Sequence, residues 1–289
     1  IYFSNVDGGA TATTALFDPK GSKFFHQNNI TGSNTQKLLI TDTGIDIGDN
    51  AITTDANVCI GYNTSVGTGA GVLGHRVAIG HQSGNDNQGY AAVAIGVGTG
   101  QSNQGRASVA ISEQAGKLGQ NSYSVAIGNY AGHGGQVQNC VAIGYWAGSN
   151  SQGGTSGSAT AIGNQCGISN QGTGAVALGA YGAGRLSQGN FAVAVGQGAG
   201  QNSQNNRSVA IGTGAGFGGQ GSSSVAIGTT AGNYMQGQQA VAIGHLAGSN
   251  DQGSSSVAIG YEAGSNAQGS KAVAVGRDAG YTNQSEGAV

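Results

Sequence analysis

The sequence predicts an all-β protein, and more narrowly a parallel β-solenoid of about fourteen coils. A Val-Ala-Ile-Gly motif recurs in fourteen copies between Val58 and Val273, and most copies are separated by the same sixteen-position step. A period this short and regular is typical of a solenoid, in which each repeat forms one coil of a stack. The composition agrees, because 58 of the 289 residues are Gly and only 8% are charged, too little charge for a disordered chain. Val289 is in phase with a further repeat, so we expect the array to continue beyond it.

Residues 1–57 lie outside the repeat and differ from it. Bulky apolar residues occur there in short runs, such as those at Phe3 and Phe24, and the only Pro of the chain, Pro19, stands in a turn-like stretch. We expect short strands and hairpins that cap the solenoid, because an uncapped end exposes strands to edge pairing. The sequence thus divides into a β-rich N-terminal cap, residues 1–57, and a repeat region, residues 58–289.

Each motif strand has a large apolar face and a small one. Counting the motif Val as position 0, the Val and Ile at positions 0 and 2 point to one side. The small residues at positions −1 and 1 point to the other. Neither face is polar, so we expect the strand to be buried on both sides. The residues taken to represent the large face are Val77, Ile79, Val93, Ile95, Val125, Ile127, Val141, Ile143, Val225 and Ile227.

Two arrangements of these strands satisfy the pattern. In the first, the small face lines a narrow interior and another chain covers the Val and Ile side chains. In the second, Val and Ile lie inside and a flat wall of small residues packs against a neighbour. An exposed aliphatic row over fourteen coils would exceed what a soluble monomer shows, so both arrangements predict a homo-oligomer with coils stacked along a common axis.

A Gln occupies position 11 in nearly every coil from Val77 onward. Amides repeated at the ~4.8 Å rung spacing can hydrogen-bond along the stack, each donating to one neighbour and accepting from the other. We expect a structural Gln ladder rather than a row of ligand sites, because ligand sites are rarely repeated in every coil. Its members are Gln88, Gln104, Gln120, Gln136, Gln152, Gln171, Gln188, Gln204, Gln220, Gln236, Gln252, Gln268 and Gln284.

Three coils are longer than the usual period, and two of them lie after Val77. The coil between Val141 and Thr160 exceeds it by three positions, with the addition near residues 153–157. The coil between Val176 and Val193 exceeds it by one position, with the addition near residues 180–182. We expect both additions to bulge outward and to leave the rungs in register.

The sequence offers no constellation for catalysis, metal binding or cofactor binding. The five His are scattered, acidic residues are few in the repeats, and no P-loop Lys follows the Gly-rich stretches. The formal net charge of −2 gives no basic face for nucleic acid, and no apolar run reaches the ~20 residues that span a bilayer. We therefore expect a protein that is not an enzyme, holds no cofactor or metal, and contacts neither nucleic acid nor membrane through this segment.

Aromatic residues gather in three of four neighbouring coils. Position 5 carries Tyr130, Trp146 and Tyr181, and Tyr145 stands beside them. Exposed rings at rung spacing can form a platform for sugar rings, so these four residues are candidate glycan contacts. The alternative is that the rings stack on one another and stiffen a Gly-rich turn.

The array of Val-Ala-Ile-Gly, then a small residue with Gly, then Gln, resembles the YadA-like head repeats (Hep/Hag type) of trimeric autotransporter adhesins. It also looks like segments of viral and phage fibre proteins. The resemblance covers residues 58–289 and implies a left-handed β-roll in which three parallel chains surround one axis. It further implies an extracellular location, on a cell surface or a virion.

These observations predict a non-enzymatic surface fibre or adhesin, a rigid trimeric β-roll that presents attachment surfaces. Its expected partners are further copies of the chain and a host-surface receptor or glycan. Two other functions stay open. One is a subunit of a self-assembling structural filament, and the other is a glycan-binding β-solenoid module that uses the aromatic residues named above.

Overall fold

The chain folds into β-strands joined by turns. The structure, a computed structural model, describes residues 75–289 throughout and the backbone of strands β1 to β6 before them. No helix occurs among these described residues, and the predicted all-β class is confirmed. The chain divides into two compact units, the first comprising residues 1–58 with 73–75 and the second residues 59–72 with 76–289.

The described residues of the first unit include five short strands with antiparallel pairing. Three of them form one sheet in the order β1-β2-β3, and β4 pairs with β5. The role of residues 1–57 as a cap stays a prediction. The strand bounds are β1 (Tyr2–Asn5), β2 (Thr13–Phe17), β3 (Phe24–Asn28), β4 (Leu39–Thr41) and β5 (Gly44–Asp46).

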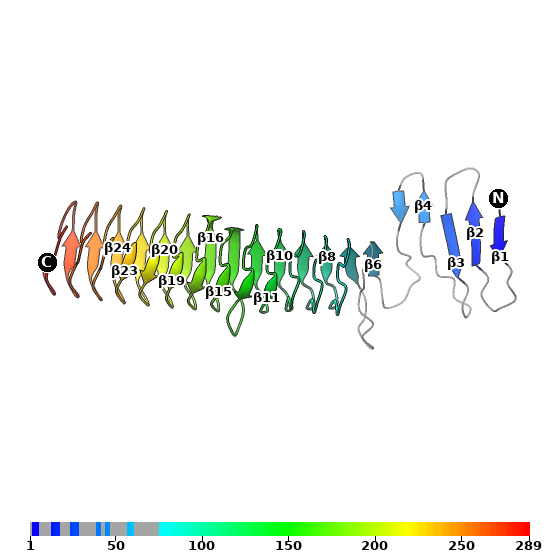
Figure 1. The fold of residues 1–289 in the computed structure, drawn as a ribbon, viewed down its shortest axis with the longest axis horizontal. Helices are drawn as coiled ribbons and strands as arrows, with labels where there is room; N and C mark the ends of the chain where they lie inside the picture. Colours follow the sequence, from blue (N-terminus) through cyan, green and yellow to red (C-terminus); the bar gives the residue numbers. More distant parts are fainter. Residues whose placement is uncertain are drawn as a thin grey trace. The chain divides into compact units, whose positions relative to one another are not determined.

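The second unit is a parallel β-solenoid, as predicted (Figure 1). Its motif strands form a 14-stranded parallel sheet in which Val125 lies beside Val141 and Ala126 beside Ala142, so sequence repeat and strand register coincide. The strands bound about 12 described turns, fewer than the fourteen coils predicted, because residues 61–74 after β6 lie outside the described ranges. The strands are β6 (Asn57–Ile60), β7 (Arg76–Ile79), β8 (Val93–Ile95), β9 (Val109–Ile111), β10 (Val125–Ile127), β12 (Val141–Ile143), β14 (Thr160–Asn164), β16 (Val176–Tyr181), β18 (Val193–Val195), β20 (Val209–Ile211), β22 (Val225–Ile227), β24 (Val241–Ile243), β25 (Val257–Ile259) and β26 (Val273–Val275).

A second parallel sheet carries the Gln residues. Seven strands form it, and isolated bridges such as Asp86 with Ser102 and Asn266 with Thr282 continue the pairing in coils on either side. The seven coils that begin at β10 to β22 therefore have two short strands each, which a repeat of this length can supply along with two turns. The strands are β11 (Gly134–Gln136), β13 (Asn150–Gln152), β15 (Ser169–Gln171), β17 (Leu186–Gln188), β19 (Asn202–Gln204), β21 (Gly218–Gln220) and β23 (Tyr234–Gln236).

Left-handed backbone conformations close each coil. Positions 5, 10 and 14 have positive φ even where the residue is not Gly, as at Trp146 (φ 56°), Ser151 (φ 55°) and Lys271 (φ 60°). At position 3 the coils also approach closely. A side chain on Gly128 (φ 122°) would lie 2.7 Å from the carbonyl oxygen of Gly144 in the next coil. The high Gly content thus reflects both the turns and the close stacking of coils.

Small side chains fill the interior of the solenoid. Ala126 at position 1 and Ala131 at position 6 are fully buried, and their equivalents along the stack are buried too, except Ala279 in the last coil, which is partly buried. Val125 and Ile127 are only partly buried, because they point to the outer side of the strand. The structure therefore adopts the first of the two arrangements, with the small face inside and Val and Ile outside.

The two insertions leave the motif strands in register. Across the longer of the two coils, Val141 still pairs with Thr160, and residues 154–156 are exposed in a loop that projects between β13 and β14 (Figure 1). In the coil that follows Val176, the extra residue lengthens β16 to 6 residues and shifts the pairing beyond Ile162.

Candidate functional site

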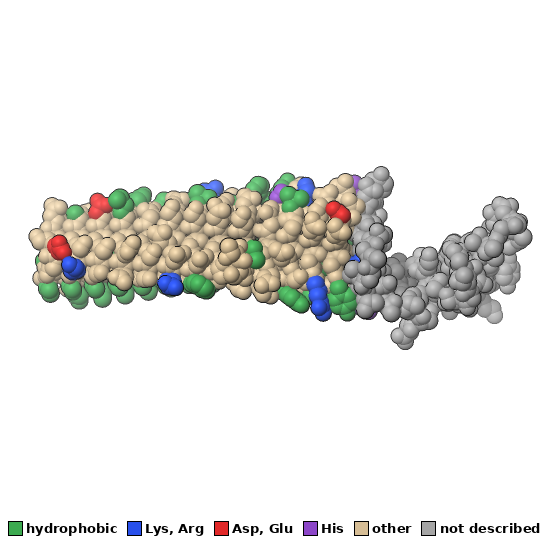
Figure 2. All heavy atoms as spheres, turned by 90° about the horizontal axis from the view of Figure 1, so that it is seen from below, with side chains coloured by type: hydrophobic (Ala, Val, Ile, Leu, Met, Phe, Trp, Pro, Cys, Tyr) green, Lys and Arg blue, Asp and Glu red, His purple; other side chains and the backbone are tan. Residues whose placement is uncertain are grey.

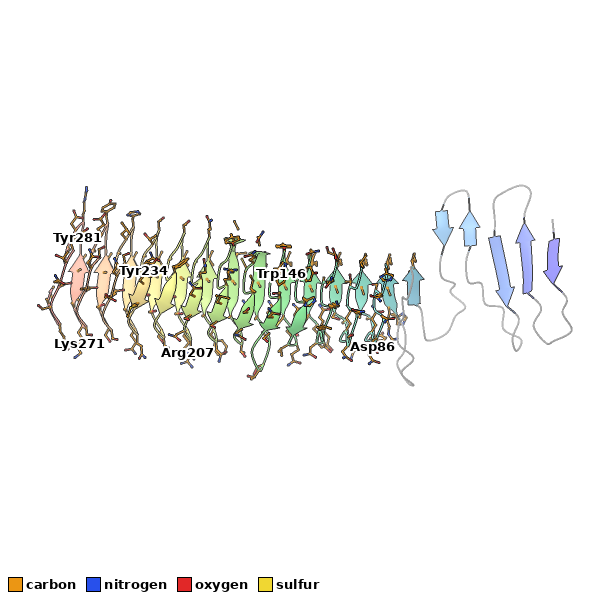
Figure 3. All side chains as sticks on the ribbon, in the orientation of Figure 1. Asp86, Trp146, Arg207, Tyr234, Lys271 and Tyr281 are labelled. Carbon is orange, nitrogen blue, oxygen red and sulfur yellow. The ribbon has the colours of Figure 1, made fainter. Side chains whose placement is uncertain are left out.

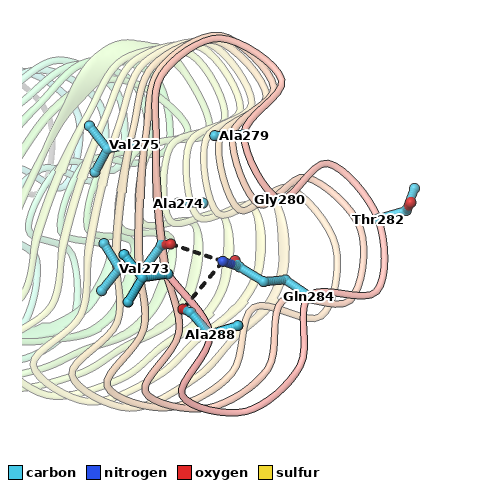
Figure 4. Close-up of a pocket in the computed structure, with 9 residues that line it drawn as sticks. Val273, Ala274, Val275, Ala279, Gly280, Thr282, Gln284 and Ala288 are labelled. Atoms are coloured by element: carbon cyan, nitrogen blue, oxygen red, sulfur yellow. Dashed lines mark hydrogen bonds between the residues drawn. The ribbon is translucent and has the colours of Figure 1, made fainter.

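The outer surface of the 14-stranded sheet is a long apolar strip, which we name the Val/Ile face after its residues at positions 0 and 2. Figure 4 shows its end, where Val273 and Val275 lie outside the coil and Ala274 lies inside. Most of these side chains are half-buried by their neighbours in the strip, and Leu178 and Ile211 are 41% and 38% exposed. In the described chain nothing packs over this face, so the aliphatic surface faces solvent.

The Val/Ile face carries no charge from β7 to β26. Position 0 is Val in every strand except β14, where it is Thr160, and position 2 is Ile except for Leu178, Val195 and Val275. The strip is therefore regular in spacing and chemistry along the solenoid. A surface of this kind matches a partner that has the same period.

The Gln side chains at position 11 point into the interior, opposite the motif strand (Figure 4). Each Nε2 donates to the backbone carbonyl of the position 0 residue of its own coil, as Gln136 does to Val125 at 3.1 Å. The thirteen bonds of this kind span 2.7 to 3.1 Å. The amide therefore ties the two strands of a coil together from within.

Nine of these amides also bond to the next Gln along the stack. The shortest bond runs from Gln136 Nε2 to Gln152 Oε1, at 2.7 Å. All thirteen amides donate to the backbone carbonyl but only nine donate to a neighbouring Gln, so bracing the coil is the more constant role. The nine links join Gln104 to Gln120, Gln120 to Gln136, Gln136 to Gln152, Gln171 to Gln188, Gln188 to Gln204, Gln204 to Gln220, Gln236 to Gln252, Gln252 to Gln268 and Gln268 to Gln284.

The ladder is interrupted within residues 88–284. Gln104, Gln171 and Gln236 have buried Oε1 atoms without a hydrogen-bond partner, because the preceding Gln does not reach them. The interruption before Gln171 follows the inserted loop, and nothing in the structure explains the other two. An unpaired buried amide oxygen is a weak point of a polar network.

Three of the four predicted aromatic residues form a cluster at one edge of the solenoid. Tyr130 stacks on Trp146 with ring centroids 5.0 Å apart and planes 15° apart, and Tyr145 meets Trp146 edge-on at 6.2 Å. The cluster lies at the edge opposite Arg207 and Lys271 (Figure 3). One face of Tyr130 and one face of Trp146 cover each other, which agrees with rings that stiffen a turn. Tyr145 is 49% exposed and keeps surface for a ligand.

Tyr181 does not stand in the column of Trp146, and the predicted alignment was wrong at this residue. The backbone N–H of Trp146 donates to Asn129, but the equivalent donor to Asn164 is Gly182 and not Tyr181. Tyr181 pairs with Asn164 instead. The extra residue of this coil precedes Tyr181 and moves it one place along, so it stands apart from the aromatic cluster.

A second aromatic group near the C-terminal coils was not predicted. The rings of His245 and Tyr261 stack with centroids 5.1 Å apart, and the guanidinium of Arg277 lies 5.1 Å over Tyr261. A shallow depression of about 360 Å³ lies beside them, and its lining includes Glu262 and Asp278. A hydrogen bond with Glu262 raises the pKa of the Tyr261 phenol. The sequence could have indicated this group, because position 4 is His, Tyr and Arg in three successive coils.

Residues 75–289 bring together few groups with chemical reactivity. Cys140 and Cys166 are free, and burial raises the pKa of both thiols, so neither is an activated nucleophile. Within this range no three His, Cys, Asp or Glu side chains are placed to hold a metal ion. The described residues also contain no helix of the length and apolarity needed to cross a membrane.

Comparison with known proteins gives no relative: no family model, no curated protein and no solved structure matches this chain. The fold and the surfaces described above therefore define its class. It is a repeat protein, a β-solenoid of β-roll coils with one uncovered aliphatic face.

Proposed function

We propose that this protein is a non-enzymatic surface fibre or adhesin, in which parallel copies of the solenoid assemble through the Val/Ile face. The observation that carries the proposal is the uncovered aliphatic strip along the whole 14-stranded sheet. Burial of apolar surface contributes roughly 25 cal/mol per Å². A strip that contributes from every coil therefore favours association strongly.

A second copy of the chain fits this face better than an unrelated partner does. The face repeats once per coil at the rung spacing, and another copy presents Val and Ile at the same spacing. The face has no charge that would select an acidic or basic partner. Three copies around one axis are the assembly that the resemblance to trimeric adhesin heads implies.

The remaining surface supports a role outside the cell. Figure 2 shows a solenoid surface dominated by uncharged polar side chains and backbone, with scattered charged residues and hydrophobic side chains along its edges. The coils of residues 75–289 stack closely and their longest loop is short, so this range offers few sites for proteolysis. A stiff, uncharged and protease-resistant rod suits the shaft or head of a fibre that presents an attachment surface to a receptor or glycan.

Sedimentation equilibrium of the purified chain tests the assembly. We expect a mass of three chains for the wild type and of one chain for the double variant Ile127→Asp with Ile143→Asp, because the carboxylates would be buried without partners. The matched control is Ser151→Asp with Asn170→Asp, which places two carboxylates in adjacent coils on exposed positions of the second sheet. A wild type that stays monomeric at high concentration would refute the proposal.

A filament subunit is the first alternative, and electron microscopy separates it from a fibre head. Oligomers of the fibre appear as short rods of one length. A filament protein forms continuous fibres whose length grows with concentration.

A glycan-binding module is the second alternative, and the exposed ring of Tyr145 beside Trp146 favours it. A glycan array tests it. Specific signals that are lost with Trp146→Ala and kept with Tyr123→Ala, an exposed aromatic residue outside the cluster, would support this function.

A further inference from the structure

We propose that Thr160 sets the axial register between copies of the chain, an inference that rests on the proposed homo-oligomer. The regular repeat of the Val/Ile face does not by itself specify how two copies align along the axis. Sliding one copy by one coil, ~4.8 Å, again places Val against Val and Ile against Ile. Apolar packing alone therefore distinguishes neighbouring alignments weakly, and a defined fibre needs a further device.

Three of the four irregular levels of the Val/Ile face lie in successive strands, and the fourth, Val275, is in the last strand, β26. Thr160 in β14 is its one polar residue from β7 to β26, Leu178 in β16 is its one Leu, and Val195 in β18 stands where most strands have Ile. Thr160 belongs to the outer side of its strand, because the next residue, Ala161, points inward and is fully buried.

A hydroxyl in an apolar interface needs a hydrogen-bond partner. In an in-register assembly, the Thr160 residues of all copies lie at one level, and each hydroxyl can donate to one copy and accept from another. A slip of one coil places Thr160 against Val141 or Val176, and the hydroxyls lose these partners. A single polar residue in an apolar seam fixes the register of coiled coils in the same way.

Leu178 determines the relative direction of the chains, because it distinguishes a parallel from an antiparallel assembly. An antiparallel arrangement centred on Thr160 would also bring the hydroxyls together. It would, however, place Leu178 and the lengthened strand β16 against β12, which has neither irregularity. Only a parallel, in-register assembly pairs both irregular levels with themselves.

Disulfide cross-linking between two tagged forms of the chain tests the proposal. Both forms carry Cys59→Ala, Cys140→Ala and Cys166→Ala; one adds Val109→Cys and the other Val125→Cys. A disulfide requires Cβ atoms about 3.8 Å apart. After co-expression and oxidation, in-register copies cross-link only within each form, and copies slipped by one coil cross-link between forms.

In the Thr160→Val background, we expect the ratio of mixed to same-form cross-links to rise by about tenfold or more. Thr160→Ser keeps the hydroxyl and should keep the register. Thr160→Val combined with Val209→Thr moves the polar level to another coil and should restore it.

Three outcomes would overturn the proposal: mixed cross-links as frequent as same-form ones with Thr160 present, a ratio that does not change in Thr160→Val, or an oligomer without same-form cross-links. A monomeric wild type in sedimentation is a different result, because it removes the proposed assembly itself.

Discussion

The amide of Gln136 lies directly against Gly132: a methyl group on Gly132 would come within 2.6 Å of Gln136 Cδ. The same relationship joins Gly148 to Gln152, where the distance is also 2.6 Å. Gly at position 7 and Gln at position 11 are thus a coupled pair. The Gly leaves the space through which the amide reaches the carbonyl of the motif strand, and its positive φ turns the chain at that point.

Gly132→Ala should therefore destabilise the solenoid by about 3 kcal/mol, since overpacking of the amide adds to the strain of an Ala at φ +56°. The matched control is Gly119→Ala, at φ +68° with no atom within 4 Å of the added methyl, which should lose about 1 kcal/mol from strain alone. Denaturant unfolding of both variants measures the difference. Equal losses would show that the amide does not need the Gly.

Gln136→Ala should lower the free energy of unfolding by about 2 to 4 kcal/mol. The change removes the bonds to Val125 and Gln152 and leaves a gap in a closely packed interior. Gln138→Ala, at an exposed position of the same coil, should change stability by less than about 0.5 kcal/mol. A Gln136→Ala variant as stable as the control would mean that the buried ladder contributes little.

The repeat alone predicted most of the fold, because a short regular period with β-branched residues at fixed positions permits few structures. It left open which face of the strand lies inside, since both faces are apolar. The narrow coil decides this, as it admits Ala126 but has no room for Ile127 beside the Gln amides. Which backbone carbonyls accept hydrogen bonds from those amides depends on the path of the turns in each coil. The residue pattern alone does not predict that path.

The aromatic cluster was only partly predictable for a related reason. From the sequence alone, the extra residue of this coil can lie before or after Tyr181. The hydrogen bond from the backbone N–H of Gly182 to Asn164 shows that it lies before Tyr181. When an extra residue lies between the motif Val and a given residue, counting from the Val assigns that residue to the wrong position in the coil.

Deletion of residues 154–156 should leave the solenoid nearly as stable as the wild type. These three residues are exposed, and their removal restores the usual coil length, with Gly153 followed directly by Gly157. We expect the melting temperature to change by a few degrees at most. Deletion of residues 205–207 is the control, because it takes the same number of residues from a coil of regular length and should cause a large loss. A large loss for 154–156 as well would show that the loop supports the rungs.

His133 should titrate below its ordinary pKa of 6.5, because burial disfavours the charged ring and the neighbouring positive charge of Lys117 adds to this effect. A proton that binds more weakly to the folded chain than to the unfolded chain favours unfolding. The stability that neutral His133 provides is therefore complete above the unfolded pKa, and it is lost as the pH falls through that value toward the folded pKa. NMR titration of the ring measures the shift. Lys117→Gln should move the His133 pKa upward by only part of it, since burial is the larger cause. A full return to the ordinary value in Lys117→Gln would assign the shift to charge rather than to burial.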